Sequence, residues 1–206
     1  MKKTGCIALC IALLTSAASA RADNVDDCNQ LQDFDLAIKA CTAIVKAPGK
    51  YKRSAVAQAY SNRGFAYAEK KQFKKAIADY NKSLARNSKD DNVYHYRGAA
   101  RLKLGDHAKA VSDISKALRL EPYNTFALND LALAYIGVGK PKQGLRAINR
   151  AIKLDPEQAN FYETRGLVYE ALGQVERALP EYGSAFHLAP IQRYRDHLER
   201  HKVAPM

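Results

Sequence analysis

The clearest metal-ligand spacing in the sequence is a histidine pair near the C-terminus. His197 and His201 are four residues apart in IQRYRDHLERHK, so on a helix both imidazoles would lie on one face. A zinc protease would also need the glutamate of HExxH, which is absent here. Charged residues surround both histidines, so we predict a solvated helix face and no metal site.

The motifs that usually mark an enzyme are missing from the sequence. There is no GxGxxG after a strand, no GxxxxGK[ST] phosphate loop and no GxSxG nucleophile motif. Serines and aspartates are frequent, but none stands in a recognisable nucleophile context. We therefore predict a protein without catalytic residues and without a cofactor.

Three arginines stand in otherwise apolar segments. Arg63 lies in NRGFAY, Arg97 in YRGAAR and Arg165 in TRGLVY. Burying a lone charge is costly, so each guanidinium must either hold an anionic ligand or pair with a carboxylate of the same chain. The choice depends on the elements that carry these arginines.

The first twenty residues have the layout of a cleavable secretory signal. MKKTGCIALCIALLTSAASA contains two lysines, a short apolar run and a small-residue end, so we expect cleavage after Ala20. An uncleaved N-terminal anchor is the alternative. No later segment is apolar enough to span a membrane. These features predict an exported protein, with the bacterial periplasm as its compartment.

The chain is basic, with a formal net charge of +12. Loss of Lys2 and Lys3 with the signal would leave +10. Seven cations crowd one stretch: Lys70, Lys71, Lys74, Lys75, Lys82, Arg86 and Lys89. Such a patch is either a solvated helix face or an attractor of anionic polymers and lipid head groups. We exclude nucleic acid as a partner because the protein is predicted to be exported.

The remainder of the chain repeats with a period of 34 residues. Gly64, Gly98, Ala132 and Gly166 are spaced by this interval. The four blocks are 57–90, 91–124, 125–158 and 159–192. Small residues recur at block positions 8 and 20 and large residues at positions 4 and 24, which predicts two closely packed antiparallel helices in each block.

This pattern resembles that of the tetratricopeptide repeat proteins. The resemblance covers roughly 57–192, with tyrosine or leucine where the family often has tryptophan at position 4. It implies an all-α fold, a right-handed superhelical solenoid of helix-turn-helix repeats. Residues 21–56 resemble a divergent first unit with a basic loop at APGKYKRS, and 193–206 are expected to form a capping helix and tail.

The block positions indicate a carboxylate partner for each of the three arginines. Position 7 is arginine in three blocks and Leu131 in the third, while position 23 is acidic in the same three blocks and Ala147 in the third. We therefore predict structural ion pairs between the two helices of a block. The pairs are Arg63–Asp79, Arg97–Asp113 and Arg165–Glu181. Arginines left free to hold an anionic ligand are the alternative.

The resemblance also places the two cysteines of the mature chain opposite each other. Cys28 and Cys41 take positions 11 and 24 of the divergent unit, which face one another in this fold. An exported protein favours a disulfide between them, and two reduced core cysteines are the alternative.

Finally, the resemblance implies a partner groove on the first helices of the repeats. The residues at its contact positions include Phe65, Asn92, His95, Leu102, Phe126, Asn129, Leu133, Ile136 and Leu167. Their apolar members would suit an extended peptide or an amphipathic helix. The lysine and asparagine of the family's carboxylate clamp are replaced by Ser61 and Phe65. The chain's own termini are an alternative occupant.

Together these features predict an exported scaffold or adaptor that binds a protein or peptide through its concave groove. The alternative is a binder of anionic cell-envelope polymer or of membrane surfaces through the basic face. Salt would separate the two, since polymer binding weakens with ionic strength and apolar groove binding does not. The identity of the partner and the oligomeric state do not follow from the sequence.

Overall fold

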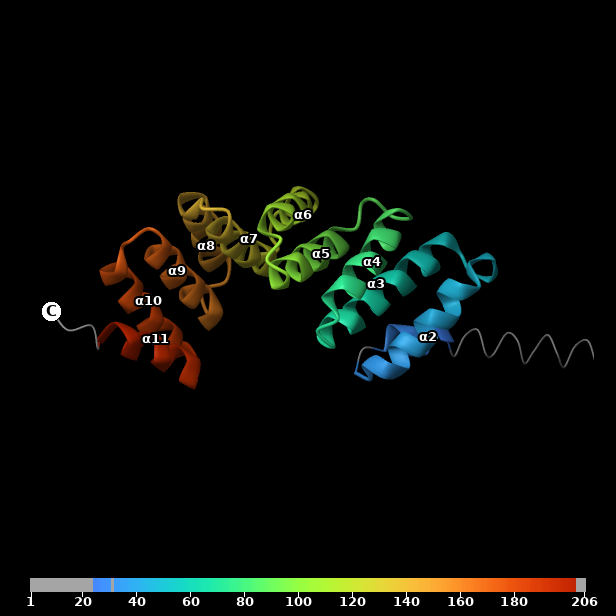
Figure 1. The fold of residues 1–206 in the computed structure, drawn as a ribbon, viewed down its shortest axis with the longest axis horizontal. Coiled ribbons are helices and arrows are strands. Elements are labelled where there is room, and N and C mark those ends of the chain that lie inside the picture. Colours follow the sequence, from blue (N-terminus) through green and yellow to red (C-terminus); the bar gives the residue numbers. More distant parts are fainter. Residues whose placement is uncertain (1–23, 31, 203–206) are drawn as a thin grey trace, which may run out of the picture. The chain divides into compact units, whose positions relative to one another are not determined.

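The computed structural model of the protein describes residues 24–30 and 32–202 (Figure 1). The predicted signal peptide, 1–20, and the end of the predicted tail, from residue 203, lie outside them. The regular structure of the described residues is helical, and they contain no strand. The predicted all-α repeat class is confirmed. None of the described helices is long and apolar enough to cross a membrane.

The chain forms two compact units that divide between Lys89 and Asp90. In the first unit, residues 24–29 form a short helical segment. It is followed by α2 (Phe34–Lys46), the 3₁₀ turn η1 (Pro48–Lys50), α3 (Arg53–Glu69) and α4 (Phe73–Leu84). The predicted basic loop is therefore shorter than expected, since part of it forms η1 and its Arg53 and Ser54 already belong to α3.

The second unit continues the helix pairs to the end of the described chain. Its elements are α5 (Asp91–Lys103), α6 (His107–Leu120), α7 (Thr125–Gly137), α8 (Pro141–Leu154), α9 (Ala159–Ala171), α10 (Val175–Leu188) and α11 (Gln192–Lys202). Each helix packs most closely on its neighbour in sequence. The last four predicted blocks thus correspond to the pairs α3–α4, α5–α6, α7–α8 and α9–α10.

The close approach within each pair depends on the small residue at position 8. A Cβ atom added to Gly64 would lie 2.7 Å from Cε1 of Tyr80, and one added to Gly98 would lie 2.5 Å from Cγ1 of Ile114. These partners are the large residues at position 24, and both are fully buried. The missing side chain is what allows the two helices to pack against each other.

The turn inside each pair needs a left-handed residue at position 15. Gly105, Gly139 and Gly173 have φ angles of 76°, 70° and 72°. In the first full block this place is taken by Lys71, which has a φ of 58°. A residue with a Cβ atom is strained there, because the side chain crowds the backbone in this region.

The C-terminal helix differs from its predicted character. It packs on α10, and His197 and Tyr194 are buried, with exposed fractions of 8% and 3%. The His197 ring stacks on the buried Tyr182 ring with centroids 4.4 Å apart. The prediction of a solvated histidine face was therefore wrong, because this face covers the last repeat.

Candidate partner-binding groove

The second unit contains an apolar groove on the first helices of its repeats. We call it the α5–α7 groove. It is a cavity of about 450 Å³ lined by Ala99, Leu102, Lys103, His107, Asp130, Leu133, Ile136 and Gly137. Leu102, Leu133 and Ile136, three of the nine predicted groove residues, come together in it. Each of the three is only partly exposed, so the groove is a recess rather than a protruding patch.

A histidine and a glycine form one wall of the α5–α7 groove. The His107 ring occupies the space where a side chain at Gly137 would stand. The Nδ1 atom of His107 is buried and has no hydrogen-bond partner among the described residues. Because this nitrogen is buried, the groove offers a ligand mainly its aliphatic walls, which would contact apolar side chains.

Two predicted groove residues are used inside the protein. His95 is buried, and its Nε2 atom lies 2.9 Å from Oδ2 of Asp130 on α7. Asn129 is also buried, at 7% exposure, so its side chain presents little surface to a partner. His95 thus connects α5 to α7, and neither residue presents much surface to a ligand.

The other predicted residues lie in several places. Asn92 is exposed on α5, and Leu167 is half-buried on α9. Phe126 is half-exposed at 51% and makes an edge contact with the buried Phe161 ring, with centroids 5.7 Å apart. Phe65 belongs to the first unit, where its ring meets Phe34 edge-on at 6.3 Å. A single strip through both units stays a prediction.

The three predicted arginine pairs come together, with unequal geometry. Arg63 and Arg97 each use Nε and Nη2 to reach both carboxylate oxygens of Asp79 and Asp113, at 2.6 to 2.9 Å. The hydrogen bond to Asp79 raises the pKa of Arg63 against the opposing effect of burial. In the third pair, Arg165 Nη2 lies 2.7 Å from Oε2 of Glu181.

A fourth arginine joins this set without having been predicted. Arg101 donates from Nη1 to Oδ2 of Asp113 at 2.6 Å, so that one carboxylate serves two guanidiniums. Arg101 stands at position 11, where other blocks have tyrosine. An arginine in place of tyrosine at position 11, in a block with an acid at position 23, was the sequence feature that could have predicted this contact.

The predicted disulfide joins Cys28 to Cys41, with Cα atoms 4.8 Å apart. Asn62 on α3 holds the same segment by donating to the carbonyl of Cys28 and to Oδ1 of Asn29, both at 3.0 Å. The short first helical segment is thus attached to both α2 and α3.

The C-terminal helix lies on the fourth repeat. His197 Nε2 is 3.2 Å from Oε1 of Glu163, and His201 Nε2 is 2.5 Å from Oε1 of Glu170. Glu163 and Glu170 stand at positions 5 and 12 of their block, which the family uses for ligand contacts. The end of the chain therefore covers contact positions of the last repeat. Among the described residues, no three His, Cys, Asp or Glu side chains converge as a metal site.

The contact with α11 perturbs two ionisable groups. Burial acts to raise the pKa of Glu170, but the Tyr182 hydroxyl and the His201 imidazole beside it stabilise the carboxylate, and the net effect lowers the pKa. Burial and the neighbouring Glu170 carboxylate raise the pKa of Tyr182 far above its usual value. The carboxylate is thus the favoured form at this contact.

The groove residues that sequence reasoning missed are His107, Gly137 and Asp130. Gly137 stands at position 13 of its block, where a helix would otherwise favour alanine. A glycine inside a helix often marks a close approach, and this was the one sequence signal for the contact with His107. Asp130 carried no signal, because an acid at position 6 looks like an ordinary surface residue.

The structure is an array of helix pairs that recur every 34 residues. Each pair packs through a small residue at position 8 and turns at a left-handed residue at position 15. Three family models, each described as tetratricopeptide repeat, match residues 57–90, 92–124 and 129–190. The chain belongs to the tetratricopeptide repeat proteins.

Solved structures share this fold. A crystal structure of MamA protein is 19% identical, has a TM-score of 0.69 and is matched over 92% of this chain and 99% of its own. MamA from Desulfovibrio magneticus RS-1, from residue 41 onward, is 18% identical with a TM-score of 0.71, over 91% and 97%. A third MamA structure is 22% identical with a TM-score of 0.66, over 76% and 88%. At these identities the likeness shows the fold alone. A comparison with curated proteins gave no match.

Proposed function

We propose that this protein is an exported scaffold or adaptor that binds an extended peptide or an amphipathic helix of a partner protein in the α5–α7 groove. The observation that carries the proposal is the convergence of Leu102, Leu133 and Ile136 around a cavity of about 450 Å³ on the first helices of the array. A recess of this kind accepts alternate apolar side chains of a peptide.

Export to the bacterial periplasm is part of the same proposal. The signal-like first twenty residues and the Cys28–Cys41 disulfide support it, because structural disulfides persist in oxidising compartments. The array has the fold of a protein-interaction scaffold, and the proposal contains no catalytic step.

The experiment is an affinity capture from envelope extract with the mature chain. Two groove variants are compared with wild type: Leu133→Glu, which introduces a charge, and Ala99→Trp, which fills the cavity without one. Leu154→Glu is the matched control, because Leu154 is 41% exposed and lies outside the groove. Circular dichroism and thermal melting check that all variants are folded.

We expect one set of proteins to be lost with both groove variants and retained with the control. Equal recovery by wild type and both groove variants would contradict the proposal.

The basic surface of the first unit would support the alternative, binding of an anionic envelope polymer or a membrane surface. Four of its seven cations already interact within the chain: Lys70 binds Asp35, Lys75 lies over Tyr67, and Lys82 and Arg86 lie over Tyr60. Recovery that is insensitive to the groove variants and disappears at high salt would favour this alternative.

A further inference from the structure

Three repeats of the array share a side-chain triad that the third repeat lacks. Tyrosine at position 4 lies under the arginine of position 7, which pairs with the acid of position 23. The guanidinium carbon is 5.6 Å from the Tyr60 ring centre for Arg63, 5.5 Å from Tyr94 for Arg97 and 5.4 Å from Tyr162 for Arg165. The triad thus fills the space beside the first helix with a ring and a closed ion pair.

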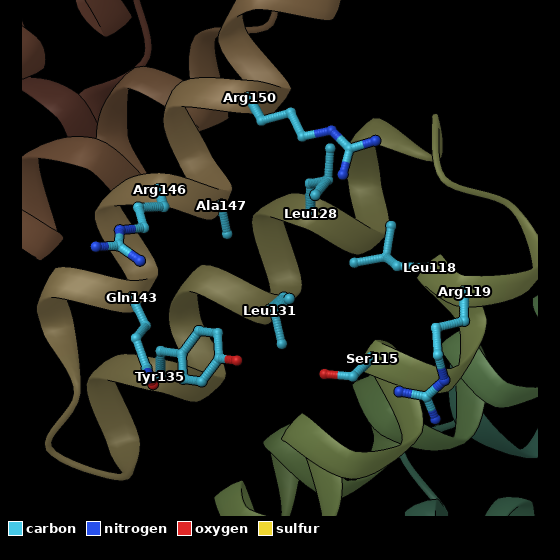
Figure 2. A pocket seen from close by; sticks show the side chains of 10 residues that line it. All are labelled: Ser115, Leu118, Arg119, Leu128, Leu131, Tyr135, Gln143, Arg146, Ala147 and Arg150. Atoms are coloured by element: carbon cyan, nitrogen blue, oxygen red, sulfur yellow. The ribbon is translucent and has the colours of Figure 1, made fainter.

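In the third repeat the triad is replaced by smaller, uncharged residues. Leu128, Leu131 and Ala147 stand at positions 4, 7 and 23. Where the ring and the ion pair would be, the structure has an open pocket of about 500 Å³ between α6, α7 and α8 (Figure 2). We call it the third-repeat pocket.

The third-repeat pocket has an apolar floor. Leu128 and Leu131 project from α7 and Leu118 from α6, and Ala147 lies on α8 across from them (Figure 2). Leu128 and Leu131 are buried, at 3% and 8% exposure, so they are already part of the core. They expose little surface themselves, and the half-buried Leu118 and Tyr135 beside them offer a bulky apolar group more surface to contact.

The rim of the pocket is positively charged and contains no acid. Arg119 on α6 and Arg146 and Arg150 on α8 line it. In Figure 2 the Arg150 guanidinium lies beside Leu128, and those of Arg119 and Arg146 lie on different sides of the pocket. Arg150 donates through Nη2 to the carbonyl of Pro122 at 2.7 Å. Arg119 and Arg146 make no ion pair within the part of the chain that the structure describes, and both are exposed. The remaining lining residues, Ser115, Tyr135 and Gln143, supply hydroxyl and amide groups.

We propose that the third-repeat pocket is a second binding site, for an acidic peptide segment of a partner that carries a carboxylate beside a bulky apolar side chain. Such a segment supplies the two components that the third repeat lacks, an apolar bulk over Leu128 and Leu131 and a carboxylate for a guanidinium of the rim. Ser115 and Gln143 can hydrogen-bond the peptide backbone. This site is separate from the α5–α7 groove and does not depend on the function proposed for it.

The test uses the mature chain and a defined probe, the hexapeptide acetyl-Gly-Phe-Asp-Leu-Glu-Gly-amide, titrated by calorimetry. A matched peptide replaces its two acids by Asn and Gln. Free 4-phenylbutyrate carries a carboxylate and an apolar ring without a peptide backbone. We expect the acidic peptide to bind at least about tenfold more tightly than either, since charge-assisted contacts and the peptide backbone both contribute.

Two variants of the protein locate the binding. Leu128→Tyr with Leu131→Arg and Ala147→Asp rebuilds the triad of the neighbouring repeats, and we expect it to fold and to lose the acidic peptide. Arg119→Gln with Arg146→Gln changes only exposed side chains, and we expect about tenfold weaker binding. Lys142→Gln with Lys153→Gln removes the same charge from α8 outside the pocket and should bind as wild type.

The proposal is overturned if the acidic peptide does not bind at millimolar concentration or binds no better than its amide counterpart. It is also overturned if the rebuilt-triad variant binds as wild type does. Equal affinity for phenylbutyrate would assign the pocket to small carboxylates instead of a peptide.

Discussion

At the residue scale, the arginines of the repeats serve mainly to close the helix pairs. Arg63 and Asp79 have side-chain exposures of 12% and 5%, and the guanidinium also donates to Oγ1 of Thr42 at 2.9 Å. Such a pair holds its geometry well but adds little net stability, because both charges lose their hydration. The third repeat accordingly keeps its fold with Leu131 and Ala147 in the same places.

The first prediction compares single and double changes at this pair. Asp79→Ala leaves Arg63 without its carboxylate, and we expect a loss of about 2–4 kcal/mol in the free energy of unfolding. Arg63→Leu with Asp79→Ala should come within about 1 kcal/mol of wild type, since both charges are gone. Denaturant unfolding measures both. The pair Arg97–Asp113 is less suitable, because Arg101 shares Asp113. Equal losses in the single and double variants would contradict the paired role.

The second prediction concerns two glycines in the last full repeat. A Cβ atom at Gly166 would collide with the ring of Tyr182, whereas one at Gly183 would meet nothing within 4 Å. We expect Gly166→Ala to lower stability by about 1–3 kcal/mol and Gly183→Ala to raise it by about 0.5–1 kcal/mol. Thermal melting of the two variants beside wild type measures both changes in stability. Opposite signs are expected, and unchanged or raised stability of Gly166→Ala would show that the helix crossing does not depend on a small residue at position 8.

A contact of this fold could be predicted from the sequence where two block positions change together. The arginine pairs were predictable because positions 7 and 23 change together, from arginine and acid to Leu131 and Ala147. The contact of His107 with Gly137 could not be predicted in this way, since no other block repeats it and the glycine alone does not identify its partner. The burial of His197 was not predicted because 191–202 has a polar sequence. Its buried face packs through an aromatic ring and carboxylate contacts, which leave no apolar pattern in the sequence.

At the element scale, the N-terminal unit relies on local attachments. Residues 24–29 form less than two turns of helix, which are too few to be stable alone. The Cys28–Cys41 disulfide and the hydrogen bonds of Asn62 connect this segment to α2 and α3. The short element therefore depends on these attachments.

The third prediction follows from this arrangement. Cys28→Ser with Cys41→Ser should lower the stability of the first unit by about 3 kcal/mol, the value expected for a closed loop of this length. Hydrogen exchange measures this loss of stability as faster exchange of the α2 amides, with the α9 amides as an internal control. An unchanged exchange rate in α2 would show that the disulfide contributes nothing to this unit.

The fourth prediction concerns acid and the C-terminal helix. The folded-state pKa of Glu170 is lowered by its neighbours, so its contribution to stability is fully present above its ordinary pKa of about 4.3 and is lost as pH falls through the lower folded value. Because the site is partly solvated, we expect only about 0.5 kcal/mol. Glu170→Gln should therefore lose less stability than wild type between pH 7 and pH 3 in denaturant unfolding. An identical pH dependence in both proteins would contradict it.

At the scale of the whole molecule, the array combines invariant and variable surfaces. The left-handed turns and the small residues at position 8 recur in the four full blocks, and the ion pairs recur in three of them. The α5–α7 groove and the third-repeat pocket occur where a repeat departs from that pattern. Gly137 departs at position 13 and shapes the groove with His107. Leu128, Leu131 and Ala147 depart at three positions and open the pocket. Departures from the repeat are therefore the places to look for recognition.

Site-specific photo-crosslinking in living cells is the decisive experiment for recognition through the α5–α7 groove. A photoreactive amino acid at Leu102 lies in the α5–α7 groove, and one at Leu154 lies on an exposed surface elsewhere on the same unit. We predict a defined crosslinked partner at Leu102, absent at Leu154 and lost when Leu133→Glu is added. Equal products at both sites, or products at Leu102 that survive Leu133→Glu, would contradict recognition through the groove.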